Sequence, residues 1–87
     1  MNTQDIIAAR EELASKTRAQ IEAETADKWA ARAVAAYERY ATTSSLADYA
    51  DATIYWHEAL EHASEAPAGT VEALKRQMTA ALNTIAR

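Results

Sequence analysis

The fold is decided by residues 3–41, which read TQDIIAAREELASKTRAQIEAETADKWAARAVAAYERYA. This stretch contains neither Gly nor Pro, and most of its residues are good helix formers such as Ala, Glu, Arg, Lys and Gln. Asn2 or Thr3 can cap its first turn, and Asp5 places a carboxylate near the positive end of the helix dipole. We therefore expect one long helix, roughly 57 Å from end to end.

Two apolar stripes run along this expected helix, one in each half. The first half carries the stripe Ile6, Ile7, Leu13, Ala14 and Ile21, and the second half carries Ala26, Trp29, Ala30, Ala33, Val34, Tyr37 and Tyr40. At about 100° per residue the two stripes lie on roughly opposite sides of the helix. Either the helix is continuous and its halves pack against different things, or it breaks near Thr25, which could act as a cap.

Two shorter helices are expected after the long one. Residues 42–45, Thr-Thr-Ser-Ser, mark the clearest break, and the spacing of Ser45 and Asp48 fits a capping box at the start of a helix over about 46–65. The only Pro and the only Gly, Pro67 and Gly69, separate it from a third helix over about 71–86.

These elements predict an all-α fold in a single domain, residues 1–87. Short connections favour an antiparallel three-helix bundle with a long first helix over about 3–41. A break near Thr25 would instead give a four-helix bundle. In the continuous form, the first half of the long helix extends past the bundle as an arm, and its apolar residues Ile6, Ile7, Leu13 and Ile21 would be left for a second copy or a partner.

The helix over 46–65 has a predicted inner and a predicted outer face. Residues at helical spacing, several of them large and apolar, define the expected inner face: Leu46, Tyr49, Ala50, Thr53, Trp56, His57, Leu60 and Ala63. The opposite face gathers Asp48, Asp51, Tyr55, Glu58 and His62. A charged face in water is one interpretation of this set, and an acidic recognition surface with a central tyrosine anchor is the other.

Composition limits the class of protein. The chain has 87 residues and a net charge of −4, and 49% of its residues are hydrophobic, although alanine supplies more than half of these. Residues 40–74 carry six acids and no Lys or Arg, which is not the basic stripe that nucleic-acid binding needs. The absence of Cys and of a long apolar run predicts a soluble cytoplasmic protein, with no membrane contact. A core this rich in alanine buries little area, so association with another chain is expected.

The sequence predicts no catalytic, cofactor-binding or metal-binding residues. The cluster around His57 and His62 is the one candidate, but zinc-protease motifs need two His four positions apart, and these are five apart. There is no Gly-rich phosphate loop, and without Cys there is no thiolate nucleophile. We expect His57 at the edge of the core and His62 on the surface.

The expected function is therefore a small acidic protein–protein interaction module without enzymatic activity. It would act as an inhibitor or adaptor that occludes a basic surface of a partner, such as a nucleic-acid-binding complex. Small helical anti-defence proteins of phages offer an analogy of size and charge. The alternative is a structural protein that self-assembles into a helical dimer or oligomer, and a metal-binding or enzymatic protein ranks below both.

Overall fold

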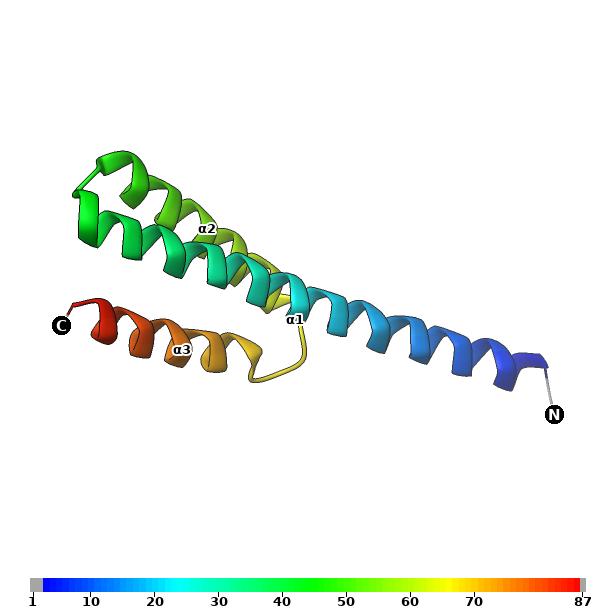
Figure 1. The fold of residues 1–87 in the computed structure, drawn as a ribbon. Helices are drawn as coiled ribbons and strands as arrows, with labels where there is room; N and C mark the ends of the chain where they lie inside the picture. Colours follow the sequence, from blue (N-terminus) through cyan, green and yellow to red (C-terminus); the bar gives the residue numbers. More distant parts are fainter. Residues whose placement is uncertain (1–2, 87) are drawn as a thin grey trace.

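The computed structural model describes the backbone of residues 3–86 and the side chains of residues 3–11 and 18–86. Within these residues the chain forms the helices α1 (Thr3–Thr43), α2 (Leu46–Ser64) and α3 (Thr70–Ile85). The all-α class is thus confirmed. The helices run alternately up and down, with α2 returning along the second half of α1 and α3 running beside both (Figure 1).

α1 continues without interruption through Thr25, the residue at which the sequence left a break open. The Thr25 hydroxyl donates a hydrogen bond to the Ile21 carbonyl at 2.8 Å, one turn earlier in the same helix. The Thr25 hydroxyl therefore has its hydrogen-bond partner within α1, as threonines inside helices commonly do, and does not cap the start of a new helix.

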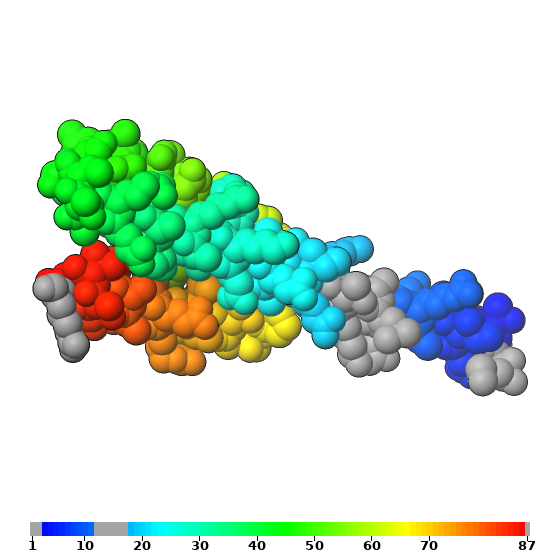
Figure 2. All heavy atoms as spheres, in the orientation of Figure 1, coloured from blue at the N-terminus to red at the C-terminus, as the bar shows by residue number. Residues whose placement is uncertain are grey.

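The first half of α1 projects well past α2 and α3, so the molecule is an elongated rod with a bundle at one end (Figures 1 and 2). Its extents are 62 × 21 × 13 Å, and its radius of gyration is 17.4 Å. A compact domain of this length would have a radius of gyration of roughly 12 Å. The difference measures how far the arm extends from the packed part of the chain.

The most extensive contact in the bundle is that between α1 and α2, and alanines supply most of the buried residues of these two helices. Six of them are buried, and we call this set the alanine seam: Ala26, Ala33 and Ala36 of α1, and Ala52, Ala59 and Ala63 of α2. Ala26 and Ala33 are seven residues apart, as are Ala52 and Ala59, which is the repeat that keeps one side of a helix against its neighbour. Small side chains let the two helix axes approach closely.

α3 closes one side of this helix pair with its two buried residues, Leu74 and Met78. Leu74 joins Ala26, Ala59 and Ala63 in the core, and Trp29, Ala30, Trp56 and Val71 pack around them. Gly69 precedes α3 with φ of 91°, a left-handed conformation that glycine adopts readily and other residues rarely do. The turn at Gly69 therefore reverses the chain after α2 and lets Leu74 reach the core.

The start of α2 differs from the predicted capping box. Ser45 makes no side-chain cap. The Asp48 carboxylate instead accepts a hydrogen bond from the Thr43 hydroxyl at 2.8 Å, and it lies 3.4 Å from the Arg39 Nε. Asp48 thereby ties the start of α2 to the end of α1 and fixes the turn between them.

Candidate functional site

The face of α2 that the sequence predicted to be outermost faces α1 instead. Asp48 bonds Thr43 and Arg39 of α1, as described above, and the Tyr55 ring lies 5.7 Å from the Trp29 ring, centroid to centroid. Asp51 and Glu58, from the same predicted face, are half-buried. The predicted placement of this face toward solvent is therefore wrong, and Asp48 and Tyr55 serve the contact between the two helices.

His62, the last member of that predicted face, joins α2 to α1 near the base of the arm. Its Nδ1 lies 2.6 Å from the Glu22 Oε2, and both side chains are partly covered. The hydrogen bond to the Glu22 carboxylate raises the pKa of His62 above 6.5, and the charges of Glu58 and Glu65 raise it further against the opposing effect of burial. His62 was expected on the solvated surface, but it connects α2 to α1 through Glu22.

The predicted inner face of α2 is correct only near the end of the helix. Ala63 is buried, and Trp56 packs against the core, as expected. Leu46, by contrast, is 78% exposed, and His57 is exposed rather than at the edge of the core. The physical reason is the alanine seam, because Ala52 and Ala59 turn the small side of α2 toward α1 and leave the large apolar residues outside.

Because α2 faces α1 with its alanines and not with the predicted inner face, a continuous surface of α2 is left uncovered, which we call the outer face of α2. It consists of Leu46, Tyr49, Ala50, Thr53, Ile54 and His57, all of them exposed. Ile54 is 58% exposed and Tyr49 is 49% exposed, even though Tyr49 also touches the rings of Tyr37 and Tyr40. Sequence reasoning missed this surface, although the seven-residue spacing of the alanines was a signal that could have revealed it.

The second uncovered surface is the arm, residues 3–21 of α1. Among its large apolar residues, Ile6 is 41% exposed, Ile7 is 51% exposed and Ile21 is 53% exposed. Leu13, predicted to belong to the same stripe, lies outside the described side chains. Among the described side chains of α1, the first that is fully buried is Ala26, beyond the end of the arm.

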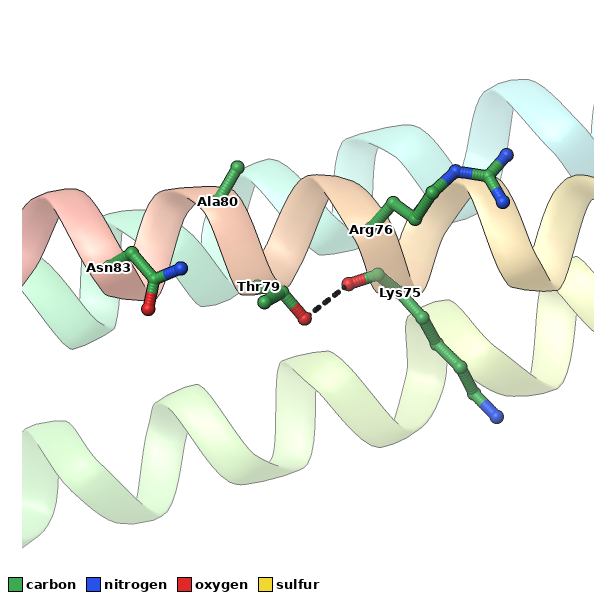
Figure 3. Close-up of a pocket in the computed structure, with 5 residues that line it drawn as sticks. All are labelled: Lys75, Arg76, Thr79, Ala80 and Asn83. Atoms are coloured by element: carbon green, nitrogen blue, oxygen red, sulfur yellow. Dashed lines mark hydrogen bonds between the residues drawn. The ribbon is translucent and has the colours of Figure 1, made fainter.

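The described part of the chain offers no assembled chemical site. No three or more His, Cys, Asp or Glu side chains of the described residues gather where they could hold a metal ion. A hollow on α3 is lined by Lys75, Arg76, Thr79, Ala80 and Asn83, all exposed and all from that one helix (Figure 3). Because a single helix lines it, this hollow encloses no substrate. Among the described helices, none combines the length and the apolar character needed to cross a membrane.

Comparison of the chain with models of known protein families, with curated proteins and with solved structures finds no match. The function must therefore be argued from the two uncovered surfaces.

Proposed function

We propose that this protein is a non-enzymatic protein-interaction module, a small antiparallel three-helix bundle that binds a partner through the outer face of α2. The observation that carries the proposal is the exposure of Leu46, Tyr49 and Ile54 along one side of a helix whose opposite side is packed on α1. An apolar surface of this kind, uncovered in the single chain, is typical of an interaction site.

The spacing of the outer face suits a helix that lies in a groove. Tyr49, Ala50, Thr53 and Ile54 follow Leu46 at three, four, seven and eight positions, which is the anchor pattern by which amphipathic helices occupy apolar grooves. Full burial of a Leu or Ile side chain is worth ~1.5–3 kcal/mol. With about half or more of each of these three large side chains still exposed, several kcal/mol remain for a partner to gain.

The charge around the outer face indicates the chemistry of the partner. Residues 40–74, which include all of α2, carry six acids and no Lys or Arg. Asp48 is paired with Arg39 of α1, and Glu61 is exposed beside the outer face. A groove with an apolar floor and a Lys- or Arg-rich rim complements this surface, and the attraction between them would speed their encounter. The module would then act as an inhibitor or adaptor that occludes a basic surface of another protein. The interaction surface differs from the sequence-based hypothesis, while the class of partner is the same.

The experiment compares the wild-type chain with two variants that each add one acidic side chain at an exposed helical position. Ile54→Glu changes the outer face of α2, and the matched control Gln77→Glu changes α3. We expect that a partner protein captured by the wild-type chain and by the Gln77→Glu variant is no longer captured by the Ile54→Glu variant. The affinity of that purified partner should then weaken as salt rises from about 50 to about 500 mM. Equal capture by all three chains would refute the surface, and an affinity independent of salt would refute the basic rim.

Self-association is the second candidate function, and the exposed isoleucines of the arm favour it. It involves a different surface, so it can hold or fail independently of α2.

A further inference from the structure

The arm carries an apolar stripe whose two ends are separated by a regular interval. Ile7 and Ile21 are fourteen residues apart, which is two heptads, so they lie on the same side of α1. Both are about half exposed, and Ile6 lies beside Ile7 at the same end. The arm is 19 residues long, roughly 28 Å, and this stripe therefore offers a seam along which a second helix can lie.

The charges of the arm are balanced, and most of the acids precede most of the bases. Residues 3–21 contain three acids and three bases, so two arms do not repel each other through net charge. The acids are Asp5, Glu11 and Glu12 and the bases are Arg10, Lys16 and Arg18, so Arg10 is the one residue that interrupts an order in which the acids precede the bases. An antiparallel copy places the acid-rich end of one arm beside the base-rich end of the other. A parallel copy would place like charges together.

One antiparallel register places Ile7 of one copy opposite Ile21 of the other and Glu12 opposite Lys16, although Arg18 then also lies opposite Arg10. When Ile7 of one copy faces Ile21 of the other, Glu11 comes within one residue position of Arg18 across the seam, and the twofold symmetry repeats both contacts. Glu11 and Arg18 are exposed and seven residues apart, so they lie along one side of the arm. In a parallel in-register pair Glu11 of one copy and Arg18 of the other are seven positions apart along the seam, so these ion pairs do not form.

We propose that two copies of this chain associate through their arms, antiparallel and symmetric, with Ile7 of each copy against Ile21 of the other. The two arms overlap over roughly 28 Å, so we expect an interface below the standard ~800 Å² on each partner and a weak dimer, in the micromolar range. The bundles lie at opposite ends of the paired arms, and both outer faces of α2 stay open. The dimer is therefore bivalent, and if the proposed function holds, it binds a multivalent partner more tightly than one copy does.

The mass in solution tests the association, measured by sedimentation equilibrium between about 1 and 500 μM. The wild type is expected to shift from monomer to dimer over this range. Glu11→Arg should weaken the dimer on the order of 10-fold, because it converts both ion pairs to like charges. Arg18→Glu should weaken it less, because it also removes the like-charge contact between Arg18 and Arg10. The double variant Glu11→Arg/Arg18→Glu restores both pairs and should bind at least as tightly as the wild type. A mass that stays at 9.5 kDa up to 500 μM, or a double variant weaker than both single ones, would overturn the proposal.

The orientation is tested by disulfide trapping, which the chain allows because it has no cysteine of its own. Mild oxidation should link an equimolar mixture of Ile7→Cys and Ile21→Cys into a covalent dimer, while each variant alone should give little. Efficient linking of each variant alone would indicate parallel arms and refute the register. Both substitutions are at exposed positions, so the helical circular dichroism signal serves as the control for folding.

The two proposals fail separately. Ile54→Glu is outside the arm and should leave the monomer–dimer equilibrium unchanged. Loss of partner capture with an intact dimer would therefore implicate α2 alone.

Discussion

The orientation of α2 can be tested by a pair of substitutions for which the structure and the sequence pattern predict opposite results. Ala52→Leu adds bulk at a position that is fully buried in the alanine seam, while Leu46→Ala removes bulk at a position that is 78% exposed. The sequence pattern placed Leu46 on the inner face and did not include Ala52 in that face. It therefore predicts that Leu46→Ala is the damaging change and that Ala52→Leu is tolerated.

The structure gives the magnitudes. Ala52→Leu inserts three carbon atoms between closely packed helices, and overpacking of this kind costs ~1–3 kcal/mol. Only about a fifth of the Leu46 side chain is covered, so Leu46→Ala forfeits ~0.3–0.6 kcal/mol of burial, part of which the better helix propensity of alanine offsets. For a domain of this size each kcal/mol shifts Tm by ~4–8 °C. We expect Ala52→Leu to lower Tm by roughly 10 °C and Leu46→Ala to lower it by less than about 3 °C.

The assay is urea and thermal unfolding followed by circular dichroism at one protein concentration, since self-association stabilises the folded chain by mass action. Equal m-values for the wild type and both variants would show that the same surface is exposed on unfolding. If Leu46→Ala proves more destabilising than Ala52→Leu, α2 faces α1 with its large apolar residues and the reasoning built on its outer face is refuted.

Three further results are expected. Leu74→Ala, at a position 2% exposed, should destabilise the fold by ~2–4 kcal/mol in urea unfolding, and a loss below about 1 kcal/mol would show that α3 is not docked on the core. The hydrogen bond to Glu22 raises the pKa of His62, so the stabilisation of the fold by this bond is fully present below pH 6.5 and is lost as pH rises through the raised pKa. NMR titration of His62 should show the raised pKa, and Glu22→Gln should reduce the shift. A wild-type His62 that titrates at or below 6.5 would contradict the contact. Gly69→Ala should cost ~1–2 kcal/mol because of its φ of 91°, although no atom lies within 4 Å of the added methyl group, and an unchanged midpoint would show that the turn relaxes freely.

The two candidate surfaces differ in how far sequence could predict them. The arm could be predicted, because a stretch with neither Gly nor Pro and about twice as long as α2 must extend beyond it, and its isoleucines then have nothing in the chain to cover them. The outer face of α2 could not be predicted from hydrophobicity alone. That argument assigns large apolar residues to the core. In α2 it placed Leu46 and Tyr49 on the inner face, but both are exposed.

Local chemistry determined the helical class, the long uninterrupted α1 and the breaks at Ser44 and around Gly69, because helix propensity, left-handed backbone positions and turn residues act over a few neighbouring residues. The tertiary structure alone decided which side of α2 meets α1. That choice depends on how closely the two helix axes can approach. The buried alanines at positions 26, 33, 52 and 59 allow a short distance between the axes, whereas Leu46 and Ile54 in the contact would keep the axes farther apart. The same packing turned Asp48 and His62 toward α1, where Arg39 and Glu22 bind them, and left the apolar side of α2 free.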